Sequence, residues 1–80
     1  MIKKVFVVKV CYPEQNNKKV IVESGTKIHC QAWLENKLDL IYQINDCFHS
    51  DDIKIIKATK NKLQFYNGNY TVIYTVEDSL

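Results

Sequence analysis

Two histidines and two cysteines in residues 29–49 are the side chains of this chain best suited to chemistry. His29 and Cys30 are adjacent, and a single residue separates Cys47 from His49. Imidazole and thiolate groups are the usual ligands of structural zinc. A neighbouring histidine can also activate a cysteine as a nucleophile. A zinc site with all four ligands requires the intervening chain to bring the two ends of this stretch together, whereas Cys47 and His49 are already close enough in sequence to form a nucleophile pair.

The stretch between them has the periodicity of an amphipathic helix over residues 30–46. At 100° per residue, its apolar side chains fall in a sector about 160° wide. This sector contains Cys30, Trp33, Leu34, Leu38, Leu40, Ile41 and Ile44. The opposite side carries Gln31, Ala32, Glu35, Asn36, Asp39, Tyr42, Gln43 and Asp46. Lys37 lies within the apolar sector, so we expect its stem to follow the core edge while its ammonium group reaches water.

Neither chemical use fits the sequence well. For the Cys47–His49 nucleophile, nothing nearby resembles an oxyanion arrangement, and a two-layer domain of this size rarely supplies a pocket. For zinc, a continuous helix separates the two ends of the stretch. Cys30 and Cys47 would lie about 25 Å apart along the axis, whereas zinc ligands lie about 2.0–2.3 Å from the metal. Cys47 and His49 alone remain an alternative half-site that a dimer could complete. The only glycines, Gly25 and Gly68, are explained as turns. We therefore predict no catalytic, metal-binding or cofactor-binding residue, no cofactor and no enzyme, with Cys30 as a small core residue.

The rest of the chain indicates five strands around this helix. β-Branched residues predict strands, and Pro, Asn and Gly predict the turns between them. The expected strands are residues 3–12, 19–23, 53–60, 62–66 and 70–77. Residues 13–19 and Asn67-Gly68-Asn69 are hairpin turns, and Ser24-Gly25-Thr26 offers helix N-caps.

The predicted fold is a single α+β domain, residues 1–80. It is a two-layer structure with an antiparallel-rich sheet of about five strands, in the order β-β-α-β-β-β, and one amphipathic helix on one face. We expect Phe6, Val8, Trp33, Leu34, Leu38 and Ile41 to form its core.

Composition limits the compartment and the partners. No apolar run reaches the roughly 20 residues that span a bilayer, so we expect a cytoplasmic protein that does not bind membranes. Three cysteines favour reduced thiols, with one disulfide plus a free thiol as the alternative. Lys, Ile, Asn and Tyr make up 32 of the 80 residues, and arginine is absent. This bias indicates a low-GC bacterium, a phage or a related mobile element, and hence a host cytoplasm for a phage protein.

One helix covers only one face of a five-stranded sheet, so we expect function to lie on the uncovered face. Val5, Val7 and Ile21 should point away from the helix, together with one of the two alternating sets of the last strand, either Tyr70 and Tyr74 or Thr71 and Thr75. An exposed apolar and aromatic area favours binding of a protein partner or self-association. The alternative is a sheet that curls into a partial barrel and buries both faces.

Charge gives a second function class. Most lysines lie on strands and turns, whereas Glu35, Asp39 and Asp46 lie on the outer helix face, followed by Asp51 and Asp52. Lysines on sheet edges can also simply prevent aggregation. Lysines beside tyrosines can bind nucleic acid, but the net charge of +2 and the absence of arginine favour a protein partner. The candidate partner-binding residues are Lys54, Lys57, Lys60, Lys62, Tyr66, Tyr70, Tyr74, Val5, Val7 and Ile21.

In size, low-GC composition, lack of a catalytic motif and compact α+β plan, the chain resembles small phage-encoded inhibitors of bacterial defence, including anti-CRISPR proteins. The resemblance is one of class, because no sequence motif carries it. It implies a stoichiometric inhibitor that binds a larger host protein or nucleoprotein.

Overall fold

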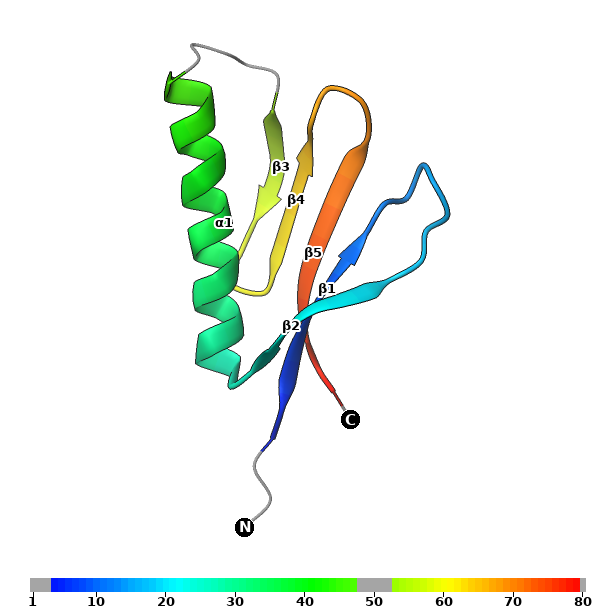
Figure 1. Ribbon diagram of the computed structural model, residues 1–80, viewed down its shortest axis with the longest axis vertical. Helices are drawn as coiled ribbons and strands as arrows, with labels where there is room; N and C mark the ends of the chain where they lie inside the picture. Colours follow the sequence, from blue (N-terminus) through cyan, green and yellow to red (C-terminus); the bar gives the residue numbers. More distant parts are fainter. Residues whose placement is uncertain (1–3, 48–52, 80) are drawn as a thin grey trace.

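The computed structural model describes residues 4–47 and 53–79, which form a five-stranded antiparallel sheet with one long helix against it (Figure 1). The elements are β1 (Phe6–Cys11), β2 (Val20–Gly25), α1 (Lys27–Cys47), β3 (Lys54–Ala58), β4 (Lys62–Tyr66) and β5 (Thr71–Asp78). This confirms the predicted α+β class and the order β-β-α-β-β-β. The strands lie in the spatial order β2-β1-β5-β4-β3, so strands from the two ends of the chain pair in the middle of the sheet.

The helix begins three residues earlier than predicted because Thr26 caps it. The backbone N–H of His29 donates to Thr26 Oγ1 at 3.1 Å, which satisfies one of the donors that a first helical turn leaves unpaired. Gly25 precedes the cap with a φ of 153°. The predicted Ser24-Gly25-Thr26 signal therefore marks the helix start correctly.

The turns explain where the strands end. Asn17 and Gly68 have φ values of 56° and 98°, which asparagine and glycine tolerate best. The predicted strand 53–60 is shorter than expected, because Thr59 closes a turn: its N–H donates to the carbonyl of Lys62 at 2.8 Å. Lys60 consequently lies in the β3–β4 turn and not on a strand.

The core lies between α1 and one face of the sheet, which we call the covered face. Val8, Cys30 and Leu63 are the most deeply buried large side chains. Of the predicted core, Val8, Leu34 and Ile41 are buried, and Phe6, Trp33 and Leu38 are partly buried against the same cluster. These side chains confirm the predicted helix face and strand phase.

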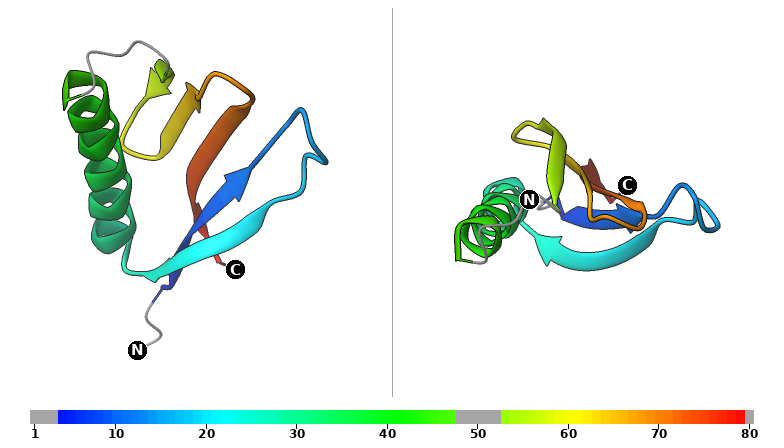
Figure 2. Two further views of the ribbon diagram at one scale, coloured as in Figure 1. Left: turned by 45° about the horizontal axis from the view of Figure 1, so that its top comes forward. Right: turned by 90° about the horizontal axis from the view of Figure 1, so that it is seen from above.

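The structure corrects the predicted apolar sector of the helix at two residues. Leu40 and Ile44 remain 50% and 44% exposed. The helix contacts the sheet through a narrower stripe that includes Cys30, Leu34 and Ile41. Figure 2 shows that the β1–β2 hairpin extends away from α1.

Within the residues that the structure describes, no helix has the length and apolar character needed to cross a membrane.

Candidate binding surface

The two cysteines of the opening stretch lie far apart. Both belong to α1, where Cys30 is completely buried and Cys47 is the exposed last residue. Burial raises the pKa of the Cys30 thiol, and the charge of Glu23 raises it further, so this thiol is a poor nucleophile. Residues 4–47 and 53–79 contain no cluster of three potential metal ligands. His49, Asp51 and Asp52 lie outside the described residues.

The strand register identifies which side chains face away from the helix. Partners opposite one another in an antiparallel ladder point to the same face. On the uncovered face they form four rows across the strands: Ser24–Val7–Glu77, Ile21–Lys9–Thr75–Lys62, Cys11–Ile73–Gln64–Lys57 and Thr71–Tyr66–Lys54. The strand order leaves β2 and β3 as edges, so the strands do not form a closed barrel. The order alone does not test the alternative of a partial barrel.

The uncovered face is more polar than the sequence led us to expect. Val7 points away from the helix as predicted but is only 5% exposed, and Cys11 on the same face is also buried. Val5, Ile21 and Tyr66 are exposed. Threonine, glutamine and lysine side chains lie between these apolar side chains, so polar residues break up the exposed apolar and aromatic area that was expected.

Tyr70 and Tyr74 lie on the covered face, away from the strand lysines. The Tyr74 ring packs between Trp33 and Phe65, with centroids 5.3 and 6.1 Å away. Burial is the main cause of a raised Tyr74 pKa. Tyr70 packs edge-on against Tyr12 at 5.4 Å. Tyr70 and Tyr74 pack against the core on the side of α1. Of the three candidate tyrosines, Tyr66 alone therefore shares a face with the strand lysines.

Glu77 provides a carboxylate for two lysines of the uncovered face. Its carboxylate lies 3.2 Å from Lys19 Nζ and 3.7 Å from Lys9 Nζ. Thr75 Oγ1 donates a hydrogen bond of 2.7 Å to it. This hydrogen bond, followed by the two ammonium groups, lowers the pKa of Glu77. Lys9 and Lys19 therefore share one carboxylate, which offsets one of their two positive charges.

A second group of lysines is not balanced in this way. Lys54, Lys57, Lys60 and Lys62, which we call the lysine cluster, occupy β3, the β3–β4 turn and the start of β4. Within residues 4–47 and 53–79, the structure records no carboxylate in contact with any of them. Lys54, Lys57 and Lys62 stand in three successive rows of the uncovered face. The lysines on β3 and β4 were predicted as a binding region, but the contact of Lys9 and Lys19 with Glu77 was not predicted.

The outer helix face has the opposite charge. Glu35, Asp39 and Asp46 are exposed along α1, on the far side of the core from the uncovered face. The molecule therefore presents a basic sheet edge and an acidic helix, a distribution that orients a charged partner during encounter.

Both sheet edges carry features that oppose further strand pairing. Val22 in β2 and Ile56 in β3 are unpaired residues at β-bulges. Lysines flank both positions in the sequence: Lys18 and Lys19 precede β2, and Lys54 and Lys57 lie on β3. Bulges and edge lysines protect a sheet from edge-to-edge association. These features favour binding through a face over binding by strand addition.

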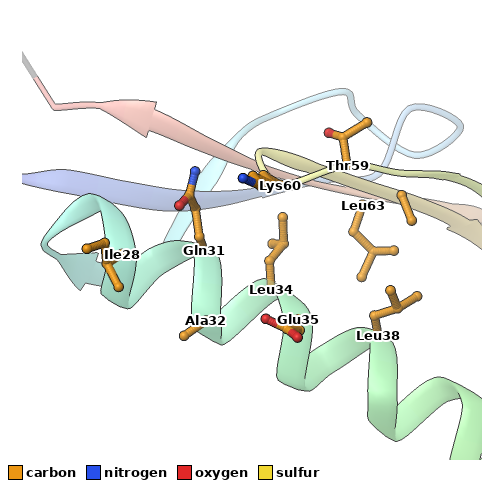
Figure 3. Close-up of a pocket in the computed structure, with 10 residues that line it drawn as sticks. Ile28, Gln31, Ala32, Leu34, Glu35, Leu38, Thr59, Lys60 and Leu63 are labelled. Atoms are coloured by element: carbon orange, nitrogen blue, oxygen red, sulfur yellow. The ribbon is translucent and has the colours of Figure 1, made fainter.

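A groove lies beside the lysine cluster, between the first half of α1 and the β3–β4 turn (Figure 3). Its volume is about 510 Å³. Leu34, Leu38 and Leu63 point toward one another in its interior, while Glu35 on the helix and Lys60 on the turn lie at its margins. No sequence pattern predicts this groove, because it depends on how the turn approaches the helix.

Comparisons of the chain with protein-family models, with curated proteins and with solved structures gave no match.

Proposed function

We propose that the protein is a non-enzymatic binding module whose lysine cluster docks on an acidic surface of a larger protein. The observation that carries this proposal is the contrast within one sheet face. Lys9 and Lys19 are paired with Glu77, whereas the lysine cluster has no contact with a carboxylate within the described residues. Four ammonium groups held on a rigid hairpin favour a partner that supplies carboxylates.

A protein partner fits this surface better than a nucleic acid. Binding of single strands depends on several aromatic side chains on which bases stack, and Tyr66 is the only tyrosine on the uncovered face among the described residues. The acidic side chains of α1 would repel a long polyanion that wraps around the domain. The apolar groove beside the cluster has an evident use in protein recognition and none in contacts with phosphates.

The biological role that we propose follows the resemblance to phage-encoded inhibitors. A small domain that occupies an acidic functional surface of a host protein blocks that surface stoichiometrically and needs no cofactor. The cytoplasm of a low-GC bacterium is the compartment that this role requires.

The test is affinity capture with the tagged protein from a low-GC bacterial lysate, with and without nuclease, read by mass spectrometry. The test variant is the triple Lys54→Gln/Lys57→Gln/Lys62→Gln. The matched control, Lys4→Gln/Lys18→Gln/Lys27→Gln, removes the same number of charges elsewhere. We expect a stoichiometric, nuclease-resistant protein that the control retains and the test variant loses. Recovery of nucleic acid with nuclease-sensitive proteins would assign the cluster to nucleic-acid binding instead. Equal capture by both variants would remove the cluster from the binding site.

A further inference from the structure

The groove between α1 and the β3–β4 turn combines an apolar interior with charged margins. Leu34 and Leu63 are 3% and 1% exposed, so they form a fixed floor. Leu38 is partly buried, and Ala32 and Ala58 at the sides are exposed. The volume of about 510 Å³ lies within the range of ligand pockets, about 300–1,000 Å³.

The shape of the groove favours a peptide segment that passes along it, and not a small molecule that it would enclose. Ile28 at one end is 79% exposed. The turn that forms one wall is held by its own hydrogen bonds, from the Lys62 N–H to Thr59 Oγ1 at 3.1 Å and between Gln31 and Asn61 side chains at 2.8 Å. The second bond ties the turn to α1, so the wall is preformed and a ligand need not order it.

The charges at the margins of the groove determine which kind of peptide segment fits it. Lys60 lies at the margin of the groove, and Lys57 and Lys62 on either side of the turn extend the positive charge onto the uncovered face. The opposite margin carries Glu35. A segment with carboxylates on the turn side therefore gains attraction from three lysines, whereas a basic segment meets them with like charge.

We propose that this groove is the anchor site for an extended acidic segment of the partner protein, which places one large apolar side chain over the floor formed by Leu34 and Leu63, beside Leu38, and places carboxylates against Lys60 and its neighbours. This inference rests on the proposed function, and it adds the chemistry of the recognised segment. Apolar anchors in pockets contribute most of the affinity in such complexes, and the surrounding charges contribute orientation.

The experiment uses a displayed library of short random peptides, selected on the intact protein. Each selected peptide is then measured against Ala58→Phe, which fills the groove from β3. A second filling variant, Ala32→Phe, acts from the helix in case the first one disturbs the edge strand. Asn36→Phe is the control, because it adds the same ring to an exposed helix position outside the groove.

We expect selected peptides to share a large apolar residue next to Asp or Glu. Their affinity should fall about tenfold or more in either filling variant and stay unchanged in Asn36→Phe. Acidic peptides that depend on Lys54, Lys57 and Lys62 but ignore both filling variants would overturn the groove assignment and leave the proposed function standing. Groove-dependent peptides that are neutral or basic would overturn both the acidic segment and the acidic partner. A selection that enriches no peptide dependent on the groove would also overturn the inference.

Discussion

The ammonium group of Lys37 lies 5.2 Å from the centroid of the Trp33 ring and 5.8 Å from that of Tyr74. Lys37 is the charged residue that interrupts the apolar sector of the helix sequence. Lys37 is partly buried, and its ammonium group, which the sequence predicted to reach water, lies over two aromatic faces, where the ring quadrupoles attract it. The lysine that interrupts the apolar pattern therefore forms a contact between α1 and β5.

Replacing Lys37 with glutamine should remove this attraction. We expect the free energy of unfolding to fall by about 0.5–1 kcal/mol, measured by urea denaturation followed through Trp33 fluorescence. Lys18→Gln, which removes a lysine from the β1–β2 turn, is the control and should change stability much less. A loss of equal size in both variants would show that net charge and not the ring contact is responsible.

Thr26 should account for the position at which α1 begins. Thr26→Ala removes the acceptor for the His29 N–H and should lower the free energy of unfolding by about 1 kcal/mol. Thr26→Ser keeps a hydroxyl at the same place and should stay within a few tenths of the wild type. Chemical denaturation of the three proteins measures the difference. An alanine variant as stable as the serine variant would contradict the capping role.

Gly25 is constrained by both its backbone and its neighbour. A Cβ on Gly25 would lie 2.8 Å from Cδ2 of His29, and the φ of 153° is one that other residues rarely adopt. The His29 ring is also held by Glu23, at 3.4 Å between Nε2 and Oε2. Gly25→Ala should therefore cost about 1–3 kcal/mol of stability.

A double-mutant cycle separates the two causes at Gly25. His29→Ala removes the ring that the new methyl group would meet, so the cost of Gly25→Ala should be smaller in that background. The cost that remains is the backbone strain. If the alanine costs the same in both backgrounds, the ring contact contributes nothing, and the position needs glycine for its φ alone.

The sequence was sufficient for the fold class and for the order of elements along the chain, because each element carries a local signal; the spatial order of the strands was not predicted. The helix follows from the spacing of Leu34, Leu38 and Ile41, and its start follows from Thr26. The last hairpin follows from Asn67-Gly68, where the Asn67 side chain accepts hydrogen bonds from the N–H groups of Asn69 and Tyr70 at 2.9 and 3.0 Å. Such signals act within a few residues, so they can be recognised without knowledge of the tertiary structure.

The candidate site was only partly predictable, because its properties arise between elements. The phase of β5 could not be chosen from sequence, since Tyr70 and Tyr74 alternate with threonines that also suit a strand. The position of α1 determines which of the two sets of β5 side chains faces the core. Likewise Glu77 pairs with Lys19, 58 residues away in sequence, and this pairing determines which lysines stay unpaired. The groove depends in the same way on the approach of Lys60 to α1.

Glu77 should make stability depend on pH with a predictable sign. Its pKa in the folded protein is lowered, first by the Thr75 hydroxyl and then by Lys19 and Lys9, from an ordinary value of 4.5. The stabilisation is therefore present above about pH 4.5 and is lost as the pH falls through the lower, folded-state pKa. Glu77→Gln should be less stable than the wild type at pH 7, and this difference should shrink in acid. Urea denaturation at several pH values measures it, with Asp39→Asn on the outer helix face as the control. A difference between wild type and Glu77→Gln that stays constant from pH 7 into acid would mean that the carboxylate gains nothing from its ionised state, and that Lys9 and Lys19 are held by other contacts.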